Sequence, residues 1–198
     1  KAINRDIQLY GPGDIIGIDK KNIIRTEPRH WITNFEPNYL AFVDCYDEGL
    51  PWRYAPAAPA GERLIPWVTL IILKEDEFED TPLKAGQPLS AIRFTASDPM
   101  EMLPSGDELW AWAHVQLNRS VIGDEHRSSN SSAIGNAVEK LLNEDPDLGF
   151  SRVICPRRPE EKAAYHAFLV PTYESGRLAG LGEIIPDTLA ANTMAWST

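Results

Sequence analysis

The chain has 198 residues, of which 43% are hydrophobic and 24% are charged. That length and balance are typical of a single folded domain that needs neither a disulfide nor a metal, and they exclude a wholly disordered chain. The formal net charge of −10 repels phosphate backbones, so we expect no nucleic-acid partner.

The first third of the chain alternates turns with short apolar segments. Residues 10–14 contain Gly-Pro-Gly and predict a turn, which short extended segments follow at 15–19 and 23–26. Residues 39–46 combine aromatic and β-branched side chains and predict a firmer strand. Residues 50–63 contain three prolines and predict a stiff loop.

Two apolar segments dominate the middle of the chain. The continuous run from Trp67 to Leu73 predicts a central strand buried on both faces, and a shorter strand is expected at residues 91–94. Residues 109–117 alternate in the manner of a strand. On that interpretation one face carries Trp110, Trp112, His114 and Gln116, and the other carries small or aliphatic side chains.

The last third predicts two helices and two strands. Apolar residues between 133 and 142 recur at helical spacing, with serines before the first of them and Pro146 beyond the last. Residues 152–155 and 165–170 predict two strands of a broad hairpin. Residues 173–181 predict a short helix that ends near a glycine. Helices and strands do not alternate regularly.

The predicted fold class is therefore α+β, with a mixed or mainly antiparallel sheet, about two helices and long proline-rich loops. We expect residues 1–198 to form a single globular domain. Because the sequence starts at Lys1 without a methionine and stops abruptly at Thr198, we expect that domain to be part of a longer protein.

Cysteine usage and hydropathy indicate the compartment. Cys45 and Cys155 lie far apart, each within an apolar run, which favours buried free thiols over a disulfide framework. The longest apolar run, residues 65–73, is too short to span a membrane as a helix, and no signal peptide is evident. We expect a cytoplasmic protein without a membrane span.

No motif for a cofactor or a metal stands out. Gly11-Pro12-Gly13 and Gly180-Leu181-Gly182 lack the spacing of a phosphate-binding loop and are interpreted as turns. Asp124-Glu125-His126 is the one compact set of metal-ligand types, and we interpret it as a solvated loop. The acidic run at residues 74–80 is interpreted as a solvated strand end in preference to a cation site. We expect no cofactor and no metal.

Two histidines keep an enzymatic alternative open. His114 and His166 each fall in a predicted strand, and they would face one another if those strands paired. A hydrogen-bonded structural histidine is the favoured interpretation of each, and a hydrolase using His114 or His166 with a neighbouring carboxylate or thiol is the alternative. Cys155 with His166 is the one Cys/His pair that this hypothesis suggests.

Tryptophan and arginine suggest a binding surface instead. The chain has six tryptophans, several of which stand beside arginine or proline. Tryptophan and arginine are the preferred anchors of protein interfaces. The candidate interaction residues are Trp110, Trp112, Trp52, Arg157 and Arg158. Flat aromatic side chains also bind sugars, which makes a carbohydrate-binding module the third hypothesis.

Three pairs of segments carry a resemblance to a known family: residues 10–19 (YGPGDIIGID) with 24–28 (IRTEP), 34–39 (NFEPNY) with 50–54 (LPWRY), and 155–159 (CPRRP) with 165–182 (YHAFLVPTYESGRLAGLG). Together they resemble the amino-terminal region of large bacterial proteins associated with phage-tail-like or contractile-injection loci. The resemblance implies a part of a larger chain or assembly and offers no catalytic motif. The sequence thus predicts a non-catalytic structural or interaction module, whose partner is another protein or the remainder of its own chain.

Overall fold

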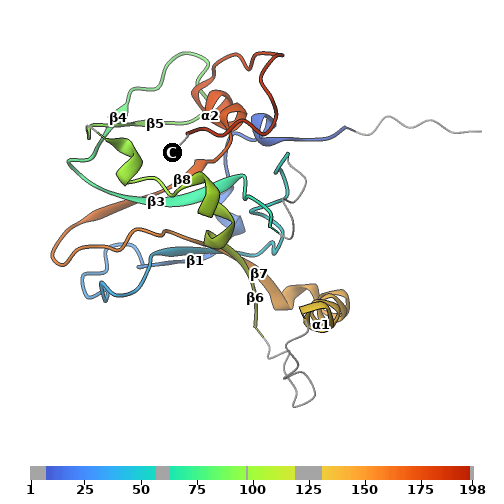
Figure 1. Ribbon diagram of the computed structural model, residues 1–198. Helices are drawn as coiled ribbons and strands as arrows, with labels where there is room; N and C mark the ends of the chain where they lie inside the picture. Colours follow the sequence, from blue (N-terminus) through green and yellow to red (C-terminus); the bar gives the residue numbers. More distant parts are fainter. Residues whose placement is uncertain (1–7, 57–62, 97, 119–130, 197–198) are drawn as a thin grey trace, which may run out of the picture.

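The computed structural model describes residues 8–56, 63–96, 98–118 and 131–196. The fold is α+β with mainly antiparallel pairing, as predicted, and each pairing between described strands is antiparallel (Figure 1). Short 3-10 turns connect many of the elements. The strands and α-helices are β1 (Ile23–Glu27), β2 (Phe42–Cys45), β3 (Val68–Lys74), β4 (Phe78–Thr81), β5 (Ala91–Phe94), β6 (Ala113–Leu117), α1 (Ser131–Glu144), β7 (Gly149–Ile154), β8 (Tyr165–Pro171) and α2 (Glu174–Leu181).

The largest sheet has four strands in the order β1-β2-β7-β6. Side chains alternate between its two faces, as the pleat of a strand requires. One face is apolar and packs against β3: Val43, Cys45 and Val153 from the sheet share a buried cluster with Leu70 and Ile72. The opposite face carries charged side chains, which are described below.

The β3–β8 pair forms a middle layer of the molecule. Leu70 and Ile72 of β3 face the four-stranded sheet, whereas Ile71 and Leu73 face the β4–β5 ribbon and pack with Phe78, Ile92 and Phe94. The predicted burial of residues 67–73 on both faces is therefore confirmed, and its cause is this layering. In hydrogen bonding, however, β3 has one ladder partner among the described strands, β8.

Two sequence predictions about strands are wrong. Residues 152–155 and 165–170 do form strands, but not a hairpin, because β7 pairs with β2 and β6 while β8 pairs with β3. Residues 109–112 belong to a 3-10 segment, Gly106–Trp112, and the strand begins only at Ala113. Alternating large and small residues satisfied a strand pattern there, but the chain buries Leu109 completely by turning.

Both predicted helices are confirmed. Helix α1 stands apart from the layers, below β6 and β7 in Figure 1. Helix α2 ends at Gly182, whose φ of 68° suits glycine and whose amide bonds back to Ala179 O at 3.0 Å. A Cβ atom on Gly182 would lie 2.6 Å from the carbonyl oxygen of Gly86, so no larger residue fits. Among the described residues, no helix has the length and hydropathy needed to cross a membrane.

Candidate functional site

The three tryptophans of the predicted interaction surface are partly buried. Trp110 is covered by the guanidinium of Arg63, whose central carbon lies 3.9 Å from the ring centroid. Trp112 lines a small cavity, and its indole N–H is buried with no hydrogen-bond partner within the described residues. Trp52 lies in a turn that its own amide closes through a 3.0 Å bond to Gly49 O. Their role in binding stays a prediction.

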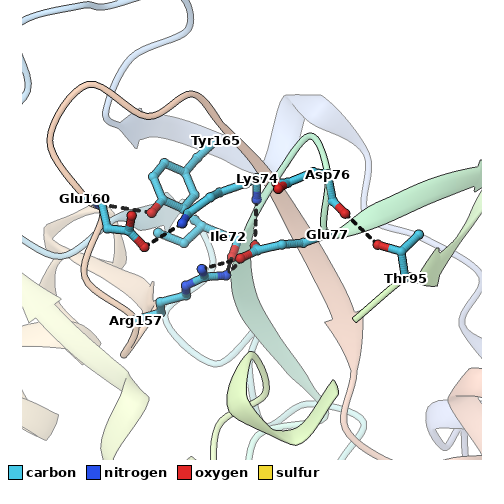
Figure 2. Close-up of polar contacts among 8 residues, drawn as sticks. All are labelled: Ile72, Lys74, Asp76, Glu77, Thr95, Arg157, Glu160 and Tyr165. Carbon is cyan, nitrogen blue, oxygen red and sulfur yellow. Dashed lines mark hydrogen bonds and ion pairs between the residues drawn. The ribbon is translucent and has the colours of Figure 1, made fainter. Parts of the chain in front are cut away.

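The Arg157 side chain is held by contacts within the molecule. Its Nη1 and Nη2 atoms each lie 2.6 Å from one carboxylate oxygen of Glu77, and Nη1 also donates to Ile72 O at 3.1 Å (Figure 2). The Arg157 and Glu77 side chains are only 20% and 17% exposed. Bidentate pairs of this kind are the stronger class of ion pair. Arg158, the neighbouring candidate, is exposed.

Further polar contacts extend the pair into a network. The Lys74 amide donates to Glu77 Oε2 at 2.8 Å, while Lys74 Nζ lies 2.6 Å from Glu160. The Glu160 amide in turn donates to the hydroxyl of Tyr165 at 3.0 Å (Figure 2). These contacts join the β3–β4 turn to the connection between β7 and β8. They cover the edge of β3 that does not face β8.

The network also determines how Glu77 titrates. Hydrogen bonding by Arg157 lowers the pKa of Glu77 from 4.5 to about 2, against the opposing effect of partial burial. Ionised Glu77 is therefore part of the native structure at neutral pH. Together with its low exposure, this gives Arg157 a structural role, while its predicted role in partner binding stays a prediction.

A second ion cluster lies on the outer face of the four-stranded sheet. Asp44, which is 1% exposed, lies between Arg25 and Arg152 on the two neighbouring strands. Arg25 Nε is 2.9 Å from Asp44 Oδ2, and Arg152 Nε is 2.7 Å from Oδ1. The Arg152 guanidinium stacks over Phe42 at 3.8 Å. This arrangement fixes the register of β1, β2 and β7.

The histidines do not come together as the hydrolase hypothesis required. Strand β6 pairs with β7 and β8 pairs with β3, so the suggestion that His114 and His166 face each other is wrong. His114 Nε2 lies 2.8 Å from Ala111 O, and the His166 ring packs edge-on against Phe78 at 5.2 Å. Both side chains are exposed.

The two thiols are poor nucleophiles. Cys45 and Cys155 are each 1% exposed and free of any disulfide. Burial, with smaller contributions from Asp44 and Asp47, raises the pKa of Cys45 to about 11, and burial also raises the pKa of Cys155. A thiol reacts as the thiolate, so both groups are inert at neutral pH.

A metal centre finds no support in the part of the chain that the structure describes. No group of three or more histidine, cysteine, aspartate or glutamate side chains is placed there to hold an ion. The cluster Asp124-Glu125-His126 lies outside the described residues.

The loop between β1 and β2, residues 28–41, presents the most exposed tryptophan. Trp31 is 87% exposed, and Tyr39 and Ile32 on the same loop are 66% and 42% exposed. The backbone φ of Trp31 is 62°, in the left-handed region that bulky residues rarely adopt. Trp31 follows Arg29 and His30 in the sequence, where no glycine or asparagine at residues 29–32 signals a turn with a positive φ.

An apolar cavity lies elsewhere, between β5, β8, α2 and the extended residues 15–18. It has a volume of about 450 Å³ and a predominantly apolar wall, which includes Ile18, Ile92 and Phe168. Its size falls in the usual range of ligand sites, about 300 to 1,000 Å³. Nothing in the sequence indicated it, because its walls come from segments far apart in the chain.

Comparison of the chain with protein-family models, with curated proteins and with solved structures finds no match. The geometry described above therefore carries the functional argument.

Proposed function

We propose that this chain is a non-catalytic interaction module of a larger bacterial protein or assembly, and that the β1–β2 loop is its binding element. The observation that carries the proposal is Trp31, which is 87% exposed on a left-handed backbone. We place the protein in the cytoplasm, where buried free thiols such as Cys45 and Cys155 remain reduced.

The backbone conformation of Trp31 supports a binding role because it is energetically unfavourable for a residue other than glycine. The Ile32 amide donates to Arg29 O at 3.1 Å, which closes a turn with Trp31 at its third position. Glycine is preferred there when φ is positive, and a non-glycine residue costs about 1–3 kcal/mol. Such strain is concentrated at sites of function. In this loop the strained backbone presents a large aromatic side chain to solvent.

Strand pairing and an ion pair anchor the base of the loop, which favours binding. Glu27 and Phe42 are opposite each other where the loop leaves β1 and enters β2. Two residues further along β1, Arg25 is bound to the buried carboxylate of Asp44. A loop ordered in advance loses less conformational entropy when it binds.

The chemistry of the loop points to a protein partner. Trp31 and Tyr39 are large aromatic anchors, and Arg29 beside them is 76% exposed. Tryptophan, tyrosine and arginine dominate the binding energy of protein interfaces. We therefore expect the partner to offer an apolar pocket for the Trp31 side chain.

The experiment compares two equally exposed apolar residues. Trp31→Ala is paired with the control Ile184→Ala, since Ile184 is 90% exposed but lies beyond α2. Wild-type protein captures partners from bacterial lysate, and any captured protein is purified and titrated against each variant. Truncation of a tryptophan at the centre of an interface costs about 2–4 kcal/mol, so we expect the Kd to rise at least about 30-fold for Trp31→Ala alone.

Equal affinity of the two variants for the purified partner would contradict the assignment of this loop. Self-association is measured in parallel by analytical ultracentrifugation. A dimer that Trp31→Ala abolishes would identify the partner as a second copy of the chain.

A further inference from the structure

We propose that the cavity between β5, β8 and residues 15–18 is a groove for an extended, uncharged apolar peptide of a partner protein. The peptide pairs with the free edge of β8 as an added strand. This site is separate from the β1–β2 loop and rests on different observations.

The residues that line the cavity show that strands meet it at their edges. Side chains of a strand alternate between its faces, so a cavity over one face is lined by every second residue. Here the lining is consecutive: residues 168–171 of β8, residues 89–92 leading into and along β5, and residues 15–18. Side chains from both faces of each segment therefore reach the groove, which places it beside the ends or edges of the strands.

The register of β8 identifies the backbone groups available for pairing. The Thr172 amide donates to Trp67 O at 3.0 Å, and the register pairs Val170 with Thr69 and Phe168 with Ile71. Hydrogen-bonded positions alternate along an antiparallel strand, so Leu169 directs its N–H and C=O away from β3. Within the described residues these two groups have no backbone partner.

The same alternation applies to β5 on the other side of the groove. The Thr95 amide donates to Glu77 O at 3.0 Å, and the register pairs Arg93 with Glu79. Ile92 therefore directs its N–H and C=O away from β4. Strand β5 has no ladder partner other than β4 among the residues that the structure describes. Two free strand edges thus border one apolar groove.

These features favour a peptide over a lipid or another small apolar ligand. An apolar wall suits either class, but an unpaired N–H and C=O on a strand edge are the groups that a bound strand satisfies. Pro171 has no N–H, which limits the added ladder to a few residues around Leu169.

The charge of the groove defines the peptide further. The chain carries a net charge of −10, yet the one charged side chain in this wall is Arg177. Arg177 is already paired with Glu174 through bonds of 2.7 Å and 2.7 Å. The wall is therefore electrically neutral, and charged side chains entering it would lose hydration without gaining a partner. The bound segment has uncharged side chains.

Two glycines provide a matched pair of variants. Gly180 lies in α2 and lines the groove, and a Cβ atom there would meet no heavy atom within 4 Å. Gly135 in α1 is equally open but lies on a different part of the molecule. Leucine is a better helix former than glycine, so Gly180→Leu and Gly135→Leu are both expected to fold. Gly180→Leu fills the mouth of the groove with a side chain.

The test selects random heptapeptides displayed on phage against the wild-type protein and against both variants. We expect enriched peptides with uncharged, alternately apolar sequences on wild type and on Gly135→Leu, and at least about tenfold weaker binding to Gly180→Leu, or about 1.4 kcal/mol. Bound peptide should slow hydrogen exchange of the Leu169 amide in NMR spectra. N-methylation of alternate peptide residues should abolish binding, whereas Trp31→Ala should leave it unchanged.

Failure to enrich peptides on wild type over Gly180→Leu would overturn the proposal. So would binding of dodecanoate to the groove without any peptide binding, because that result identifies a site for small apolar ligands. A bound peptide that leaves exchange of the Leu169 amide unchanged would equally overturn the pairing with β8.

Discussion

The connection around Arg157 and the loop around Trp31 contain similar residues but differ in burial. The Arg157 side chain is 20% exposed, whereas Trp31 is 87% exposed. Each follows a strand and contains two prolines, and in each an arginine is near an aromatic residue: Arg29 is two residues before Trp31, and Arg157 lies near the Tyr165 ring. Around Arg157 the chain supplies every partner: Glu77 for the charge, Ile72 O for a third hydrogen bond and the Tyr165 ring, 5.5 Å from the guanidinium. Around Trp31 the chain supplies few partners, and the indole ring is exposed to solvent.

The difference lies in what each segment faces. The Arg157 segment crosses the free edge of β3, whose buried carbonyl of Ile72 must be hydrogen-bonded. The β1–β2 loop extends beyond the end of its sheet (Figure 1), and Trp31 on it is 87% exposed. The residues next to a side chain in the sequence therefore do not determine whether that side chain stabilises the fold or is available for a partner.

Removal of the Arg157 side chain should have the largest effect. Arg157→Ala leaves the 17% exposed Glu77 carboxylate without its partner; breaking a fully buried pair costs about 3–5 kcal/mol, and we expect a loss near the lower end of that range for this partly buried pair. Urea unfolding followed by tryptophan fluorescence measures the loss in the free energy of unfolding. Arg158→Ala is the matched control, because Arg158 is exposed, and its effect should stay within about 0.5 kcal/mol. Equal losses in the free energy of unfolding for Arg157→Ala and Arg158→Ala would contradict a special structural role for Arg157.

The second largest effect is expected in acid, where the Arg157–Glu77 pair should contribute less to the free energy of unfolding. The pKa of Glu77 is lowered from 4.5 to about 2, so its contribution is complete above pH 4.5 and is lost as the pH falls toward 2. The shift corresponds to about 3 kcal/mol at most, because one pKa unit is about 1.36 kcal/mol, and solvent screening of the partly exposed pair lowers that figure.

Glu77→Gln isolates this effect from other carboxylates. The difference in unfolding free energy between wild type and Glu77→Gln should be largest at pH 7 and should shrink between pH 4.5 and pH 2. A difference that stays constant across this range would show that Glu77 is not held ionised by Arg157.

The smallest effect on stability is expected at Trp31. Trp31→Gly removes an exposed side chain and relieves a positive φ, while glycine adds about 0.5–1 kcal/mol of backbone entropy to the unfolded state. The relief of strain, about 1–3 kcal/mol, equals or exceeds this entropic cost, so the free energy of unfolding should stay the same or rise by up to about 2 kcal/mol. Differential scanning calorimetry measures it. A loss comparable to that of Arg157→Ala would mean that Trp31 stabilises the fold and is not held for a partner.

Local patterns in the sequence determined much of the secondary structure. The helical spacing of residues 133–142, the glycine after α2 and the unbroken apolar run of β3 each specified an element that the structure contains. These features depend on side chains within a few residues of one another, whose preferences act before any long-range contact forms.

Strand pairing and exposure were decided only by the tertiary structure. Strands β7 and β8 follow one another along the chain, but each lies in a different layer. Arg157 meets Glu77 across 80 residues, and the groove joins segments from opposite ends of the sequence. Such contacts form because the layers bury apolar faces and satisfy the buried backbone and charges. Neither condition can be read from neighbours in sequence, so Trp31 and the groove became visible only in the fold.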